Sequence, residues 1–79
     1  MIDQDQTMER PIFIVDDEPE ILLAVDTSLR MAGFNNIITI SDSRDVIRQM
    51  ERQLPCLIIL DLNMPHINGS RILKMIRKT

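Results

Sequence analysis

The feature that most constrains the fold is a set of three short apolar runs separated by stretches of helical periodicity. The runs occupy residues 12–15, 37–40 and 56–60, and the second, Ile-Ile-Thr-Ile, is β-branched throughout and includes the polar Thr39. Consecutive apolar residues, rather than alternating ones, indicate strands that are covered on both faces, as in parallel sheets. Pro11 opens the first run, where a proline is tolerated because the first residue of a strand need not donate a hydrogen bond. The runs therefore predict three parallel strands.

Helical faces fill the intervals between these runs. Pro19 suits the first turn of a helix, and Gly33 offers a left-handed C-terminal cap. Between them, the apolar residues at helical spacing are Ile21, Leu22, Val25, Leu29 and Ala32. A second helical face precedes Pro55, and a third helix is expected from about Ser70. The order β-α-β-α-β-α predicts an α/β fold, a partial doubly wound parallel sheet.

Composition narrows the classes of function. The net charge is −3, and no basic stripe or aromatic platform suggests direct nucleic-acid binding or an anionic membrane as partner. No run approaches the ~20 apolar residues of a membrane span, and the acidic N-terminus is unlike a signal peptide, so we expect a cytoplasmic location. We predict that residues 1–10 form a flexible tail and that Cys56, the single cysteine, is a buried apolar thiol.

Acidic residues follow two of the three apolar runs. Asp16 and Asp17 come directly after the first run, and Asp61 comes directly after the third. Because the carboxyl ends of parallel strands meet at one edge of a sheet, we expect these side chains to lie close together. Adjacent carboxylates repel one another unless they share a cation, and Mg²⁺ is commonly held by carboxylates, waters and phosphate oxygens. A carboxylate beside such a cation can also be the nucleophile of phosphoryl transfer.

A plainer interpretation of the same acids is open. Asp17, Glu18 and Glu20 stand at the start of the first predicted helix, where carboxylates interact favourably with the helix dipole. A single aspartate after a strand, such as Asp61, is more often a loop or capping residue. The joint placement of an acidic pair and a single aspartate at one predicted sheet edge favours the metal site.

The segments IVDDEPEI, LIILD and LNMPHINGSRIL resemble the receiver domain of two-component response regulators. The resemblance extends over residues 11–79 and implies a flavodoxin-like fold. It also implies that this stretch is the N-terminal portion of a receiver domain, lacking the last two strand–helix units of the family. With the family's strand order 2-1-3-4-5, the strand at 57–60 would form an uncovered edge, so we expect self-association through it.

The resemblance also implies a role for each matching residue. Asp61 corresponds to the phosphoacceptor, Asp17 to a direct Mg²⁺ ligand and Asp16 to a ligand acting through water. The backbone carbonyl of Asn63 would complete the metal site. The implied function is a phosphorelay signalling module that takes its phosphoryl group from a sensor histidine kinase. Such a module is not an enzyme beyond its own phosphorylation and dephosphorylation, and Mg²⁺ is its implied cofactor.

Two other functions remain open. One is a receiver fragment that acts only as an interaction or dimerisation module, because the Ser/Thr and Lys of the family's later strands have no counterpart up to Thr79. The other is a haloacid-dehalogenase-like phosphatase, because Asp61 and Asn63 vaguely resemble that family's aspartate nucleophile and a nearby polar ligand. That family places its nucleophile on an early strand, so the resemblance is weak. Dinucleotide binding is disfavoured because the turn after the first run lacks Gly-x-Gly-x-x-Gly.

Overall fold

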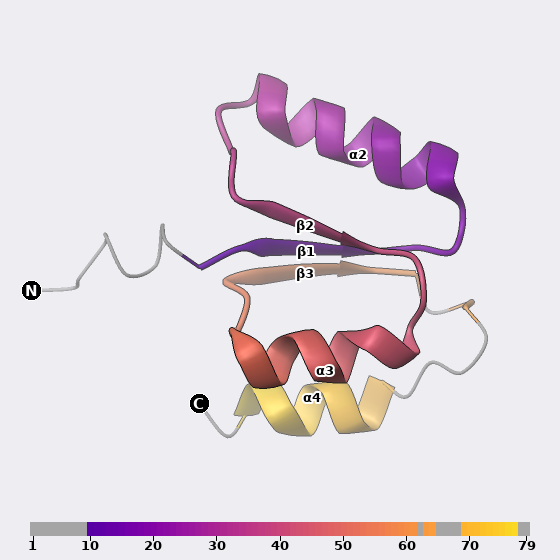
Figure 1. The fold of residues 1–79 in the computed structure, drawn as a ribbon, viewed down its shortest axis with the longest axis vertical. Coiled ribbons are helices and arrows are strands. Elements are labelled where there is room, and N and C mark those ends of the chain that lie inside the picture. Colours follow the sequence, from indigo (N-terminus) through magenta and orange to yellow (C-terminus); the bar gives the residue numbers. More distant parts are fainter. Residues whose placement is uncertain (1–9, 62, 65–68, 78–79) are drawn as a thin grey trace, which may run out of the picture.

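Six elements alternate along the described part of the chain, which comprises residues 10–61, 63–64 and 69–77 of a computed structural model. They are β1 (Ile12–Val15), α2 (Pro19–Met31), β2 (Ile37–Ile40), α3 (Arg44–Arg52), β3 (Leu57–Leu60) and α4 (Gly69–Arg77) (Figure 1). The predicted alternation of strand and helix is therefore confirmed. The predicted tail lies outside the described residues, apart from the exposed Arg10.

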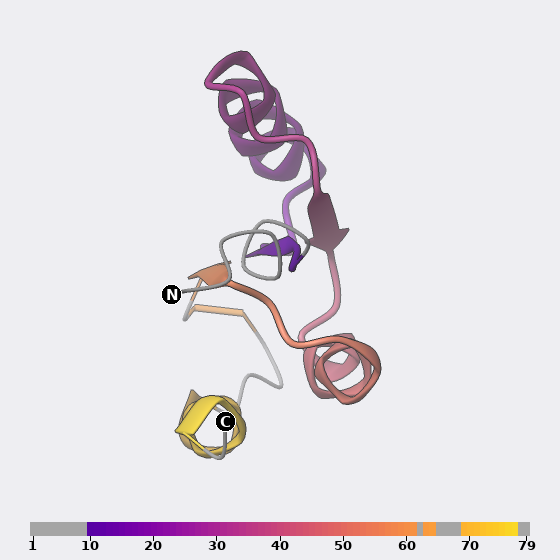
Figure 2. The ribbon, with the colours of Figure 1, turned by 90° about the vertical axis from the view of Figure 1, so that its left-hand side faces the viewer.

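The three strands form one parallel sheet in the order β2-β1-β3. The register aligns Ile12 with Ile37 on one side and with Leu57 on the other. Helix α2 covers one face, and α3 and α4 lie side by side on the opposite face (Figures 1 and 2). This is the predicted doubly wound arrangement. Strand β1 lies in the centre of the sheet, and helices cover both faces. Its side chains are therefore buried whichever face they point to, which explains why all four are apolar.

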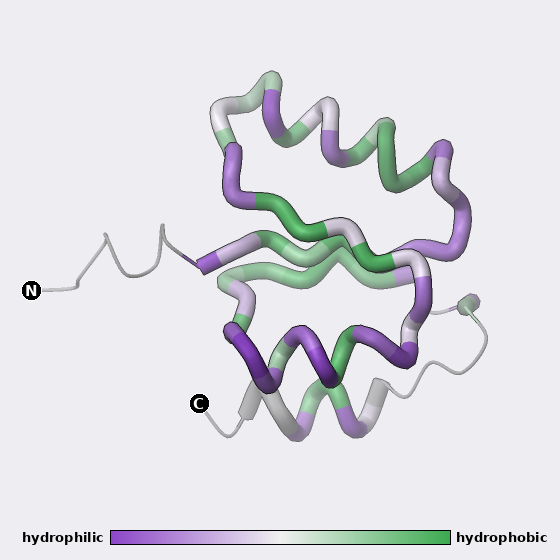
Figure 3. The backbone as a smooth tube through the Cα atoms, viewed as in Figure 1, coloured by the Kyte–Doolittle hydropathy of each residue, from purple (hydrophilic) through white to green (hydrophobic). Residues whose placement is uncertain are grey.

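The larger core lies between the sheet and the pair α3 and α4. Phe13 and Val15 point to this side, and both are almost completely buried. The helices contribute Val46 and Met50 from α3 and Ile72 from α4. The strands are mostly apolar, with a paler segment in β2, whereas the helices mix polar and apolar residues (Figure 3). The periodicity seen in the sequence therefore corresponds to real one-sided burial.

The face under α2 is only partly covered. Ile12 and Ile14 pack against Leu22, and the side chains of Leu57 and Ile59, at the same register and therefore on the same face, remain 51% and 36% exposed. Correspondingly, only part of the predicted apolar face of α2 is buried. Leu22 is buried and Val25 and Leu29 are half-buried, but the prediction was wrong for Ile21 and Ala32, which are exposed. Helix α2 packs mainly against β1 and β2, so only a narrow strip of its surface is buried.

Helix α2 ends as its sequence predicts. Ala32 is the last residue with right-handed geometry, and Gly33 follows with φ of 103°, a conformation that glycine adopts without a steric penalty. The N–H of Gly33 donates to the carbonyl of Arg30, and the N–H of Phe34 donates to that of Leu29. This is a Schellman motif, and it satisfies carbonyls that the helix leaves without a partner.

Cys56 is a correction to the sequence prediction, because it is exposed rather than buried. It stands one residue before the first paired residue of β3, which is an edge strand of the described sheet. Its backbone N–H donates to the carbonyl of Pro11, but its side chain lies beyond the covered part of the strand. The apolar run in the sequence therefore begins one residue before the paired part of β3.

Within the described ranges, none of the helices is long and apolar enough to cross a membrane.

The burial pattern predicts that stability depends on Phe13. We expect Phe13→Ala to cost about 3–5 kcal/mol, which is as much as a core of this size supplies, so the variant should be unfolded at 25 °C. Leu23→Ala is the matched control, because Leu23 is 67% exposed on α2 and alanine favours helix. Far-UV circular dichroism with urea titration measures both. A cooperative transition of Phe13→Ala at the parent midpoint would contradict the assignment of the core.

Candidate metal centre

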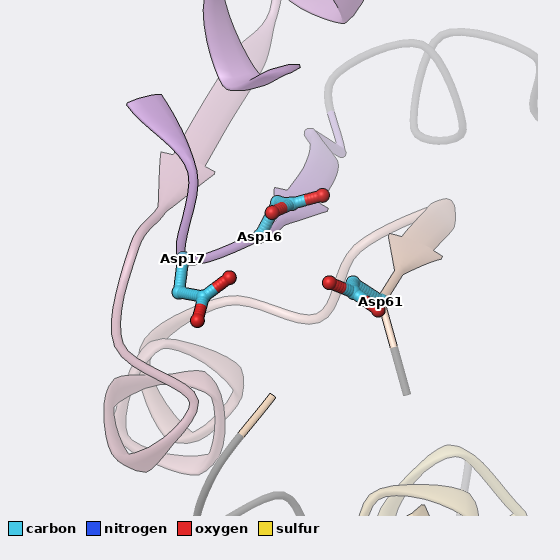
Figure 4. Close-up of side chains that lie close together, drawn as sticks. All are labelled: Asp16, Asp17 and Asp61. Atoms are coloured by element: carbon cyan, nitrogen blue, oxygen red, sulfur yellow. The ribbon is translucent and has the colours of Figure 1, made fainter. Parts of the chain in front are cut away.

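Three aspartates meet at the carboxyl-terminal edge of the sheet. Asp16 follows β1 and Asp61 follows β3, and the pairing of Val15 with Leu60 brings these two strand ends side by side. The backbone N–H of Asp61 extends the pairing by donating to the carbonyl of Val15 at 3.0 Å. Asp17 comes next in the turn toward α2. Figure 4 shows the three carboxylates gathered around one point between the two strand ends.

The carboxylates are close enough to act together. One oxygen of each aspartate can be chosen so that all three lie within 4.8 Å of one another. The three side chains differ in access, since Asp16 is 7% exposed, Asp61 is half-buried and Asp17 is exposed. The structure thus brings together the three acids that the sequence singled out, with one wall of the cluster buried and one open to solvent.

Two short backbone turns fix the orientation of Asp16 and Asp61. The N–H of Glu18 donates to Oδ1 of Asp16, and the N–H of Asn63 donates to Oδ1 of Asp61, both at 2.9 Å. Each is an Asx turn, in which an aspartate accepts from the residue two positions ahead. These turns were not predicted from the sequence. Their only signal is an aspartate that directly follows an apolar strand, a position where the chain has to change direction.

The donor set fits a hard divalent cation. Two oxygens bound to Mg²⁺ at about 2.1 Å lie roughly 3.0 Å apart when adjacent and roughly 4.2 Å apart when opposite. The separations here, within 4.8 Å, therefore need only a small closing movement or one intervening water. Ion pairs between described residues involve Asp26, Asp42 and Asp45 instead of the cluster. A cation is the natural neutralising partner of carboxylates placed in this way.

Asn63 is the fourth residue that the sequence analysis connected with this site. It is exposed and lies in the turn that follows Asp61, where its backbone N–H holds the aspartate as described above. Its predicted contribution, a backbone carbonyl for the metal, stays a prediction, as do the separate roles assigned to the three aspartates. The contact that the structure does describe gives Asn63 a second task, which is to orient Asp61.

The crowding of carboxylates predicts that removing one charge stabilises the metal-free chain. Two unit charges 4.8 Å apart repel by about 1 kcal/mol in water, so Asp17→Asn should raise the free energy of unfolding by roughly that amount at low salt with EDTA. Glu20→Gln is the control, because it removes a carboxylate from the first turn of α2 without touching the cluster. Urea unfolding at pH 7 measures both. Equal shifts in the two variants would show that only the helix dipole is involved.

Comparison with known proteins agrees with this geometry. Residues 12–79 match the response regulator receiver domain family. The chain is 32% identical over 71 residues to the alkaline phosphatase synthesis transcriptional regulatory protein PhoP of Bacillus subtilis, covering 90% of this chain and 29% of that protein. It is 38% identical over 72 residues to the regulatory protein VanRc of Enterococcus gallinarum, covering 91% of this chain and 31% of that protein.

A third relative extends the similarity almost to the whole chain. The probable transcriptional regulator ycf27 of Guillardia theta is 32% identical over 77 residues, which is 98% of this chain and 30% of that protein. The chain thus spans about a third or less of the length of these relatives. The family match covers nearly all of the described residues, including every strand, every helix and the acidic cluster. The chain belongs to the family of response regulator receiver domains.

Proposed function

We propose that this chain is a phosphoacceptor module of a two-component system, in which Asp61 takes a phosphoryl group from a sensor histidine kinase. The observation that carries the proposal is the convergence of Asp16, Asp17 and Asp61 within 4.8 Å at the carboxyl edge of the sheet. Asp61 suits the role of acceptor because it is half-buried, so it is reachable by a donor while its turn holds it in place.

The chemistry follows from the orientation of Asp61. Its Oδ1 accepts the N–H of Asn63, so Oδ2 is the oxygen that can turn toward a phosphorus atom. Attack forms an O–P bond and breaks the P–N bond of phosphohistidine, and the imidazole nitrogen keeps the electron pair and is protonated. The product is an acyl phosphate on Asp61. The chain acts on itself in this reaction and is not an enzyme with a separate substrate.

The remaining groups of the site would hold Mg²⁺. Asp17 and Asp61 are the proposed direct carboxylate ligands, the carbonyl of Asn63 adds a third oxygen, and Asp16 acts through a water. The burial of Asp16 and its bond from Glu18 support this division, because a held, buried carboxylate can orient a water without moving. When bound, the cation would neutralise charge on the transferred phosphoryl oxygens.

The wider setting is part of the same proposal. The relatives are named as transcriptional regulators, and they are about three times as long as this chain. We propose that any regulation of transcription is carried by other regions, and that this chain, with its net charge of −3, does not itself contact nucleic acid. A cytoplasmic location belongs to the proposal as well. The family assignment leaves the phosphatase interpretation without support.

Phosphorylation is directly measurable by intact-mass spectrometry. After incubation with Mg²⁺ and phosphoramidate, which carries the P–N bond of phosphohistidine, the parent chain should gain one phosphoryl group. Asp61→Asn should gain none, because an amide is not a nucleophile for this transfer, and EDTA should prevent the gain in the parent. Asp26→Asn is the control, since Asp26 pairs with Arg30 on α2, away from the site. A phosphorylated Asp61→Asn chain would place the acceptor elsewhere.

Self-association is a second candidate function, favoured by the state of β3. This strand lies at an edge of the described sheet, and its side chains Leu57 and Ile59 are exposed on the face toward α2. A second copy could add its own β3 in antiparallel orientation about a two-fold axis normal to the sheet. Residues on the same face would then pair, with Leu57 opposite Ile59 of the other copy, so that four apolar side chains form one stripe.

A lysine in the edge strand tests this candidate. Ile59→Lys should abolish concentration-dependent association, because a charged side chain on an edge strand opposes pairing with another chain. Leu23→Lys makes the same chemical change at an exposed position of α2 and should leave association intact. Sedimentation velocity over a range of concentrations is the measurement. A parent chain that sediments as a monomer throughout, or equal effects of the two variants, would exclude the candidate.

A further inference from the structure

Met64 is a buried apolar residue in the turn that follows the acceptor aspartate. Its side chain is 4% exposed, whereas Asn63, directly before it, is exposed. Between Asp61 and the start of α4, these two residues are the ones that the structure describes. The chain thus leaves strand β3, passes one residue in solvent and then places the next residue in the core.

The core that contains Met64 also contains the carboxyl ends of the strands. Val15 pairs in register with Ile40 on one side and with Leu60 on the other, and these are the last residues of β1, β2 and β3. Val15 and Ile40 belong to the same cluster of buried residues as Met64, and Leu60 packs against that cluster. Met64 is therefore held in the part of the core that adjoins the acidic cluster.

Asn63 links this buried residue to the acceptor carboxylate. Its backbone N–H donates to Oδ1 of Asp61 at 2.9 Å, and its own side chain is exposed, so burial of Asn63 does not hold the donor in place. The backbone has only two soft dihedral angles per residue. Fixing Met64 in the core therefore limits the directions in which the neighbouring N–H of Asn63 can point.

We propose that Met64 is a positioning residue for the phosphoacceptor. Its burial holds the turn in which the N–H of Asn63 orients the carboxylate of Asp61. This inference rests on the proposed function, in which Oδ1 of Asp61 is held and Oδ2 attacks the phosphorus atom. Without the buried side chain, the carboxylate would rotate more freely, and Oδ2 would face a donor for a smaller fraction of the time.

The test compares Met64→Ala with Met50→Ala. Met50 is 2% exposed on α3 and belongs to the same buried cluster, so its variant deletes the same side chain from the same core without touching the turn. The first measurement is the ¹⁵N-relaxation order parameter of the Asn63 N–H, without Mg²⁺ and in sucrose, which stabilises compact states. Met64→Ala should lower it from about 0.85 to below about 0.6, and Met50→Ala should leave it at the value of the parent.

The second measurement is the rate at which the chain gains a phosphoryl group from phosphoramidate, divided by the folded fraction from circular dichroism. Met64→Ala should be slower by roughly tenfold or more, and Met50→Ala should stay within about twofold of the parent. Met64→Leu conserves the buried volume and should restore both the order parameter and the rate. If an alanine variant is unfolded in sucrose, Met64→Val and Met50→Val, which remove less of the side chain, take the place of the pair.

Two results would overturn the proposal. Equal changes in the Met64 and Met50 variants, or an unchanged order parameter of Asn63 in the Met64 variant, would make Met64 an ordinary core residue. A Met64→Leu chain as slow as Met64→Ala would also contradict it, because leucine keeps the burial. The order parameters need no phosphorylation. If the parent gains no phosphoryl group, the phosphoacceptor proposal fails, while the order parameters still decide whether Met64 holds the turn.

Discussion

The parallel pairing of β1 with both of its neighbours is the constraint on which the rest of the structure depends. Because β1 is central, its side chains are buried on both faces, and Phe13 and Ile14 anchor two different cores. Because all three strands run the same way, their carboxyl ends share one edge, and Asp16 and Asp61 become neighbours although 44 residues separate them along the chain. One register therefore fixes both the core and the candidate site.

The acidic cluster lowers the local stability of the metal-free chain, because three carboxylates lie close together. Carboxylates within 4.8 Å repel one another. The chain holds them by attaching Asp16 and Asp61 to the backbone of their own turns, through Glu18 and Asn63. Both donors are backbone N–H groups, so no further side chain is needed to hold Asp16 and Asp61 in orientation in the absence of a cation. The two turns thus orient Asp16 and Asp61 without a bound ion.

The strands and helices could be predicted from the sequence, because their apolar periodicity is strong. The burial of individual side chains could not, because it depends on which element packs against them. The burial of β1 and the glycine cap of α2 follow from local patterns, and the meeting of Asp16 with Asp61 follows from parallel topology. The exposure of Cys56 and Ile21 could not be predicted, because an apolar residue is buried only where another element covers it. The Asx turn at Asp61 depends on backbone geometry that a residue type alone does not specify.

The two faces of the sheet are covered unequally, with a larger core on one face than on the other. This difference connects the stability of the chain with its possible interactions. The face under α3 and α4 is covered by two of the described helices, and Phe13 is fully buried there. Among the described helices α2 alone covers the other face, and Leu57 and Ile59 on that face are exposed. Covering them would remove apolar surface from water at about 25 cal/mol per Å², in a domain whose total stability is small. A partner that paired with β3, as proposed above, would therefore also stabilise the sheet that carries Asp61.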